Sequence, residues 1–194
     1  MYRLYHKLLL LFIFFCCFNF AFSQDQSLSD GESAIFKDEL LENLIGIWEL
    51  TGVVAGDSVV NIFEARWVLN HQFLQLHYKD VNVPSQYEAL VYVGFNHQEN
   101  RYVVHWLDIF GGSYSEILGF GRRENNSITF VFKSSDSLLH NTFKWFPNQQ
   151  KWISYIKQQD QDGKWQSFAI QEIHKKTKRK RYTSKIHIKF GSSQ

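Results

Sequence analysis

From residue 45 to residue 174, apolar and polar side chains alternate with a period of two, and turn-forming residues interrupt the alternation at short intervals. Because successive side chains of a β-strand point to opposite faces, each uninterrupted run predicts a half-buried strand. The breaks contain the residues that favour turns, such as Ala55-Gly56-Asp57, Asn125-Asn126 and Pro147-Asn148. The predicted strands cover residues 45–54, 59–69, 72–79, 86–95, 101–109, 114–121, 128–133, 138–146, 151–158 and 164–173.

No helical period separates these runs, so parallel βαβ units are not expected. Short links between consecutive strands favour an antiparallel up-and-down meander. An open meander of this size would leave two long edges unpaired, and closure into a barrel removes both edges. The predicted fold class is therefore all-β: a ten-stranded antiparallel barrel over residues 45–174. An eight-stranded barrel already has room for one small ligand, and ten strands enclose more space.

A different pattern precedes the strands. Ser29 and Glu32 have the spacing of a helix capping box, and apolar residues then recur at helical spacing up to Leu44. The pattern predicts one short helix over residues 32–44, ending near Gly46. We expect this helix, within an N-terminal segment of residues 24–44, to cover one end of the barrel.

The first 23 residues have the features of a secretory signal peptide. Arg3 and Lys7 precede an unbroken apolar run over residues 8–18, and Ala21-Phe22-Ser23 supplies small residues where a signal peptidase cleaves. We therefore expect export to the periplasm or the medium after cleavage near Ser23. Both cysteines lie inside this segment, so the expected mature chain has no disulfide, no thiolate nucleophile and no cysteine-ligated metal.

Charge is distributed unevenly along the chain. The formal net charge is +2, but residues 175–194 contain eight basic and no acidic residues. Residues 24–174 contain 11 basic and 19 acidic residues, a net charge of −8. A basic tail can contact an anionic lipid surface, an acidic partner or nucleic acid, or it can be a solvated terminus that keeps the protein soluble. We expect no specific nucleic-acid partner.

Several short motifs resemble those of an exported bacterial family of lipocalin-like proteins in the calycin superfamily, a family known mainly as a domain of unknown function. Gly46-Ile47-Trp48 opens the first predicted strand, and Asp162-Gly163-Lys164 precedes the last. The central stretch carries Tyr87-Glu88, Gly94-Phe95-Asn96, Tyr102, Trp106-Leu107-Asp108 and Gly119. The resemblance covers about residues 40–174 and implies a calycin-like barrel of unassigned activity, in which Trp48 closes one end. Asn96 stands where the family usually shows Asp, and Lys175 follows the last strand where Arg is more usual.

Five residues are the candidates for contact with a ligand. Tyr102, Trp106 and Asp108 share one face of their predicted strand, and Trp48 and Glu88 are added from the motifs above. Two interpretations of Asp108 stay open: a carboxylate beside an indole that orients a ligand, or a strand-end residue that binds turn amides. Glu88 is either a buried polar anchor paired with an arginine or a solvent-facing residue.

The sequence contains no nucleophile elbow, phosphate loop or zinc-protease motif. No histidine pair has metal-ligand spacing. The position of His174 resembles that of the late histidine through which nitrobindin-like barrels bind haem, but we interpret it as the point where the chain leaves the barrel and expect no cofactor. The favoured function is binding of a small hydrophobic or amphipathic molecule by a monomer or weak dimer. The alternatives are a hydrolase or isomerase using Glu88 or Asp108 as acid–base group, and a surface-interaction protein acting through the basic tail.

Overall fold

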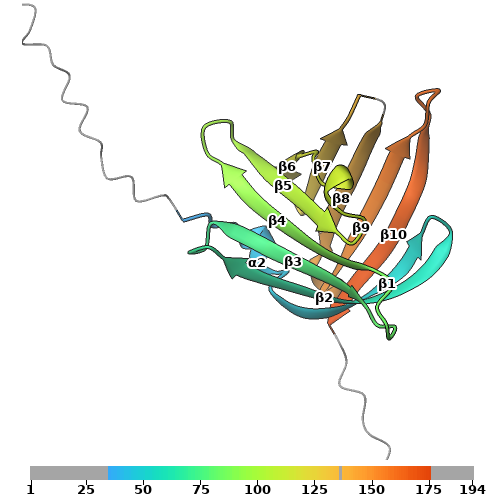
Figure 1. Cartoon of the computed structure of the whole chain (residues 1–194). Coiled ribbons are helices and arrows are strands. Elements are labelled where there is room, and N and C mark those ends of the chain that lie inside the picture. The colour runs from blue at the N-terminus through green and yellow to red at the C-terminus, as the bar shows by residue number, and fades with distance from the viewer. Residues whose placement is uncertain (1–34, 136, 176–194) are drawn as a thin grey trace, which may run out of the picture. The chain divides into compact units, whose positions relative to one another are not determined.

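A computed structural model describes residues 35–135 and 137–175. Within these residues ten strands form a closed barrel, with one short helix and two 3-10 turns (Figure 1). The elements, in chain order, are α2 (Glu39–Glu42), β1 (Gly46–Val54), β2 (Asp57–Val68), β3 (Phe73–Asp80), β4 (Glu88–Asn96), β5 (Arg101–Asp108), η1 (Gly112–Tyr114), β6 (Gly119–Glu124), β7 (Ser127–Lys133), β8 (Leu138–Phe146), η2 (Pro147–Gln149), β9 (Lys151–Gln159) and β10 (Trp165–Lys175).

Every strand pairs antiparallel with the next one along the chain, and β1 pairs with β10 to close the sheet. Leu50 illustrates the closure, because it lies opposite Asn61 on β2 and opposite Ile173 on β10. Each described strand pairs with a strand on both sides, although β6 pairs with only Tyr102–Val104 of β5, and closure in this way reduces exposed edges in an all-β chain. The prediction of a ten-stranded antiparallel up-and-down barrel is confirmed.

Nine of the ten predicted strands agree with the observed bounds to within two residues. The exception is the run over residues 114–121, which was expected to be one strand. The observed strand β6 begins only at Gly119, and the residues before it form the turn η1 and a loop. Tyr114 and Ile117 are exposed in this loop, so their alternation does not reflect a buried face.

The predicted helix over residues 32–44 is not confirmed at that length. Among the described residues only Glu39–Glu42 are helical, and residues 35–38 are not. The helix begins where the Asp38 carboxylate accepts hydrogen bonds from the backbone N–H groups of Leu40 and Leu41, at 2.8 and 3.1 Å. The proposed capping box at residues 29–32, the signal peptide and the tail beyond Lys175 lie outside the described residues. No helix in the described part of the chain is long and apolar enough to cross a membrane.

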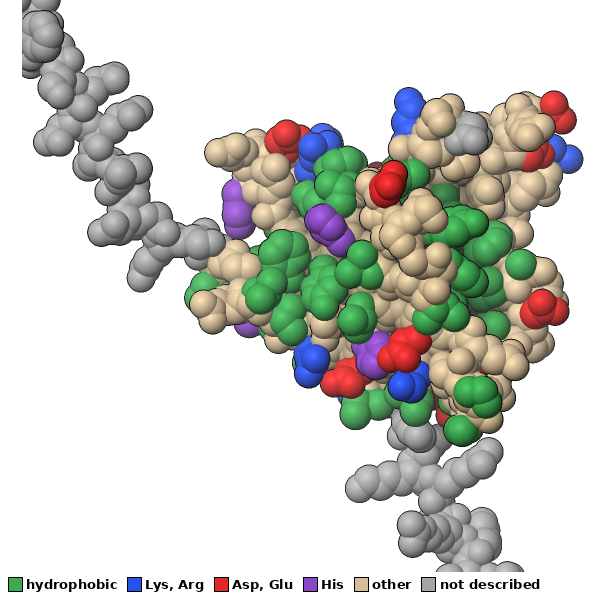
Figure 2. Space-filling view, viewed as in Figure 1, with side chains coloured by type: hydrophobic (Ala, Val, Ile, Leu, Met, Phe, Trp, Pro, Cys, Tyr) green, Lys and Arg blue, Asp and Glu red, His purple; other side chains and the backbone are tan. Residues whose placement is uncertain are grey.

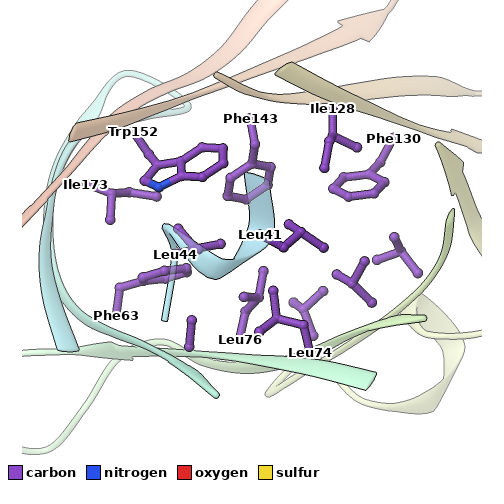
Figure 3. Packing of buried hydrophobic residues seen from close by; sticks show 14 of the residues in the cluster. Leu41, Leu44, Phe63, Leu74, Leu76, Ile128, Phe130, Phe143, Trp152 and Ile173 are labelled. Atoms are coloured by element: carbon purple, nitrogen blue, oxygen red, sulfur yellow. The ribbon is translucent and has the colours of Figure 1, made fainter. Parts of the chain in front are cut away.

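The hydrophobic core fills the end of the barrel that contains α2. Leu41 and Leu44 project from the helix region among inward-facing side chains of the surrounding strands, including Phe63, Phe143 and Trp152 (Figure 3). Leu44 and Trp152 are at most 1% exposed. Burying such side chains contributes about 1.5–3 kcal/mol each, so the single helical turn is held by packing rather than by its own propensity.

Three indole N–H groups satisfy acceptors at the end of this helical turn. Trp48 Nε1 donates to the Leu44 carbonyl at 2.7 Å, and Trp152 Nε1 donates to the Asn43 carbonyl at 3.3 Å. Trp67 Nε1 donates to the Glu42 carboxylate at 2.8 Å. Carbonyl groups at a helix C-terminus have no partner within the helix, so these indoles provide the hydrogen bonds that water would otherwise supply.

Candidate functional site

The barrel interior is packed at one end and part-exposed at the other. Near α2 the inward-facing residues are completely buried: Leu50, Phe63, Leu74 and Val104 are 0% exposed. We call this the closed end. Toward the end that carries the β1–β2, β3–β4 and β5–β6 connections, inward-facing residues are only part-buried, namely Val59, Trp106, Phe132, Leu139 and Ile156. We call this the open end, because its interior wall is accessible to solvent.

Two of the five residues selected from the sequence belong to the closed end. Trp48 is 1% exposed and binds the Leu44 carbonyl, so it helps to hold the helical turn in place. Lys175 Nζ lies 5.7 Å from the centre of the Trp48 ring, within the range of a cation–π contact. The Tyr102 hydroxyl donates a hydrogen bond to the Asp38 carboxylate. Both side chains therefore face the interior, and the contacts that they make are to the protein itself.

Glu88 faces away from the interior. Its neighbours Ala89 and Val91 alternate into the core, whereas the Glu88 carboxylate lies 2.7 Å from His77 Nε2 and 3.4 Å from Lys79 Nζ. The hydrogen bond from His77, followed by that from Lys79, lowers the pKa of Glu88 from its ordinary value. Of the two interpretations of Glu88, the buried anchor paired with an arginine does not apply: Glu88 is a part-exposed, outward-facing member of a surface charge cluster.

The outer surface around this cluster is mixed in character. In Figure 2 hydrophobic side chains gather over β3 and β4, with a histidine flanked by acidic and basic groups below them. Leu90 and Tyr92 share this outer face with Glu88, since they follow it at intervals of two along β4. Asp108 belongs to the inner face of the next strand, so Glu88 and Asp108 do not form a pair of carboxylates across one site.

Asp108 lies at the open end of the inner face of β5. Its Oδ1 accepts a hydrogen bond from the Phe110 backbone N–H at 3.0 Å, and its part-exposed side chain follows Trp106 by two residues. This contact agrees with the interpretation of Asp108 as a strand-end residue that binds turn amides. Burial raises the pKa of the nearby Tyr87, and the negative charge of Asp108 adds to that rise.

An aromatic group lines the β3–β5 wall beside Asp108. The rings of Tyr78 and Trp106 are 5.3 Å apart, and those of Phe63 and Tyr78 are 4.8 Å apart. Burial, with the nearby Tyr87 as a second cause, raises the pKa of Tyr78 well above its ordinary value. Burial also raises the pKa of Tyr87 to about 12, partly offset by a hydrogen bond from Trp106. These phenols therefore stay neutral near pH 7 and present hydrogen-bonding hydroxyl groups.

The β8–β10 wall and the nearby strand β2 carry four buried polar residues that were not selected from the sequence. Asn61, Asn141, Ser154 and Gln171 are 5%, 2%, 1% and 6% exposed. Their neighbours two positions away are apolar, as in Val59–Asn61–Phe63, so these residues lie on the inner faces of β2, β8, β9 and β10. We call this set the polar floor, because it lies where the packed closed end meets the part-exposed open end. The sequence signal for each of these residues is a polar side chain at a position where the alternation along the strand predicts an apolar, inward-facing one.

Strand register brings the polar floor together. Gln171 lies opposite Ser154 on β9 and opposite Gly52 on β1. Ser154 Oγ donates a hydrogen bond of 2.9 Å to Asn141 Oδ1. On its other side, Gly52 lies opposite Val59, and Val59 comes two residues before Asn61 on β2. Because glycine has no side chain, Gly52 leaves the inner wall open between Asn61 and Gln171. Asn141, Ser154 and Gln171 are therefore neighbours on the wall, and Asn61 lies diagonally across Gly52 from Gln171.

Two members of the polar floor have unused hydrogen-bonding capacity. Within the described residues, the side-chain amides of Asn61 and Gln171 have no hydrogen-bond partner in the protein. Among the described residues, Arg101 Nε is the one side-chain nitrogen or oxygen that is both fully enclosed and without a hydrogen-bond partner, and its guanidinium group stacks on Phe120. The amide groups of Asn61 and Gln171 are therefore not fully enclosed. The Asn61 and Gln171 amides must therefore reach accessible space inside the barrel, since a buried, unpaired amide would be costly.

Histidines and carboxylates do not assemble into a metal centre among the residues that the structure describes. His174 follows the inward-facing Ile173, so it lies on the outer face, where its Nε2 is 3.4 Å from the Glu49 carboxylate. It therefore does not point into the barrel.

Compared by sequence, the chain matches no family model, and no curated protein matches it. Its function is therefore inferred from the geometry of the barrel.

Proposed function

We propose that this protein binds a small hydrophobic or amphipathic molecule in the open end of its barrel. The observation that carries the proposal is the contrast between the two halves of the interior. Residues such as Leu50 and Phe63 are fully buried at the closed end, whereas Val59 and Trp106 face inward at the open end and remain part-exposed. An inward-facing apolar wall that the protein does not cover is what a small-molecule site offers.

The aromatic residues of the β3–β5 wall support the same function. The part-exposed Trp106 faces the interior of the open end and packs against the buried Tyr78, and Phe110 and Tyr114 extend aromatic surface to the connection between β5 and β6. Phe110 and Tyr114 are 62% and 75% exposed. Apolar surface at an accessible barrel end can interact with a ligand that enters from solvent. The lipocalin-like motifs and the signal-peptide pattern fit an exported carrier of this kind.

A pair of adjacent residues provides the test. Val59 faces the interior of the open end, whereas Val60 faces outward and is 42% exposed. The variant Val59→Trp adds an indole to the proposed site, and Val60→Trp adds the same group to the outside. The probe is Nile red, a neutral apolar dye that fluoresces in apolar surroundings.

We expect wild-type protein and Val60→Trp to bind Nile red saturably, and Val59→Trp to lose at least about ten-fold in affinity, a change of ~1.4 kcal/mol. Circular dichroism and thermal unfolding establish that both variants are folded. Absence of saturable binding to the wild type, or equal binding by the two variants, would contradict the proposal.

A further inference from the structure

We infer that the polar floor recognises an uncharged hydrogen-bonding group, such as a carboxamide or an alcohol, at the inner end of the bound molecule. The inference rests on the proposed function and adds the chemical class of the ligand. The polar floor supplies the amides of Asn61, Asn141 and Gln171 and the hydroxyl of Ser154. A primary amide both donates and accepts hydrogen bonds, so it pairs with a group that does the same.

The placement of the polar floor determines which part of the ligand it meets. It borders the packed residues Leu50 and Ile173, which lie on neighbouring strands at the closed end. A molecule that enters from the open end therefore reaches the polar floor last. Its apolar body then lies along the part-exposed inner residues of the open end, such as Trp106 and Val59. The ligand is thus amphipathic, with its polar group directed inward.

The hydrogen-bonding state of the polar floor indicates that it has capacity for a ligand. Ser154 already donates to Asn141 Oδ1, which fixes the orientation of that pair. The amides of Asn61 and Gln171 have no such partner within the described residues, although both residues are nine-tenths or more buried. An incoming hydroxyl or amide would satisfy them, and this gain is lost when the ligand lacks a polar group.

The charges on the inner face exclude a carboxylate ligand. Of the lysine and arginine residues on the described strands, only Arg123 and Lys175 are in phase with the inner face, and both lie at the closed end. Arg123 is already paired with Asp38 at 3.2 Å. At the open end, Asp80 and Asp108 are in phase with the inner face and carry negative charge. A carboxylate would therefore be desolvated without a cation and repelled at the entrance.

Three eight-carbon probes distinguish the head groups: octanamide, 1-octanol and octanoate at pH 8. Each competes with Nile red for wild-type protein and for the double variant Asn61→Leu/Gln171→Met, which keeps the side-chain size and removes both amides. Gln98→Met, in the exposed β4–β5 turn, is the matched control. Thermal unfolding shows that each variant is folded.

We expect octanamide and octanol to bind the wild type at least about ten-fold more tightly than octanoate. In the double variant the affinity for octanamide falls about ten-fold, as expected for the loss of one to two hydrogen bonds, while Nile red binding changes less than about two-fold. Gln98→Met behaves as the wild type.

Two results would overturn the inference while leaving the proposed function intact: octanoate binding as tightly as octanamide, or a double variant that retains the wild-type preference for octanamide. Failure of Nile red and all three probes to bind the wild type would overturn the proposed function, and this inference with it.

Discussion

The Tyr102 hydroxyl on β5 donates a hydrogen bond to the Asp38 carboxylate, which lies 64 residues earlier in the chain. The same carboxylate caps the helical turn through the backbone N–H groups of Leu40 and Leu41 and accepts a hydrogen bond from Arg123 Nη1 at 3.2 Å. The Asp38 side chain is 6% exposed. One buried carboxylate therefore joins the helical turn to β5 and β6 at the closed end of the barrel.

Replacing Asp38 with alanine should destabilise the protein by about 2–4 kcal/mol, since it removes a helix cap and leaves Tyr102 and Arg123 without their shared acceptor. Asp38→Asn should cost less, because asparagine also caps helices but cannot pair with the guanidinium. The measurement is the free energy of unfolding in guanidinium chloride. Asp57→Asn, at the exposed start of β2, is the control. Tyr102→Phe combined with Asp38→Ala should cost less than the sum of the single changes, and simple additivity would contradict the shared contact.

The indole hydrogen bonds at the helix end provide a graded prediction. Trp48→Phe removes a 2.7 Å bond from a residue that is 1% exposed, and it leaves the Leu44 carbonyl without this partner. We expect a loss of about 2 kcal/mol in the free energy of unfolding. Trp67→Phe removes a bond to the exposed Glu42 carboxylate and should cost less than about 1 kcal/mol. Equal losses in the two variants would indicate that ring volume, rather than the hydrogen bond, holds the turn.

The alternation of side chains was sufficient to predict the barrel. Asn61, Asn141, Ser154 and Gln171 were detectable by the same alternation, because each interrupts an apolar stripe that points inward. They were not selected from the sequence, because they are neutral, are not aromatic and belong to none of the motifs that suggested the candidate residues. Conversely, sequence reasoning placed Glu88 in the site although the phase of β4, set by Ala89 and Val91, directs that residue outward.

Contacts between distant segments could not be predicted in this way. The residues around Asp38 in the sequence do not indicate that it binds Tyr102 and Arg123. These partners come from β5 and β6, which lie next to Asp38 only in the closed barrel. The part-exposed state of Trp106 likewise depends on how far the helix-end core extends into the barrel. Alternation identifies the face of a residue, but the depth at which the interior is filled depends on packing among all ten strands.

Gly52 lies where the backbones of β1 and β10 approach each other closely. A Cβ added there would lie 2.2 Å from the Ile170 carbonyl oxygen, which belongs to the backbone and cannot rotate away. Gly52→Ala should therefore separate β1 from β10 and lower the free energy of unfolding by about 3 kcal/mol or more. Gly112→Ala is the matched control, because nothing lies within 4 Å of its added Cβ, and it should change stability by less than about 0.5 kcal/mol. Amide hydrogen exchange should show the loss of protection in β1 and β10, and unchanged protection there would contradict the role of Gly52.

Three tyrosines, of which Tyr78 and Tyr102 are buried and Tyr87 is part-buried, predict a loss of stability in alkali. Burial raises the pKa of Tyr78, of Tyr87 to about 12, and of Tyr102, where the hydrogen bond to Asp38 adds to the effect. A tyrosine in the unfolded chain ionises near pH 10, whereas these residues keep their protons in the folded state. Their contribution to stability is therefore complete below about pH 10 and is lost as the pH rises toward the folded-state values.

We expect the unfolding midpoint in guanidinium chloride to fall between pH 10 and pH 12, and tyrosinate absorbance at 295 nm to measure the cause directly. After a rapid jump to pH 11, the folded wild type should show fewer tyrosinates than the guanidinium-unfolded chain. Tyr87→Phe should lower the absorbance of the unfolded chain by one tyrosinate and leave that of the folded protein nearly unchanged. If Tyr87→Phe lowered both absorbances equally, Tyr87 would be ionised in the folded state at pH 11, and its burial beside Trp106 and Asp108 could not protect it as the structure requires.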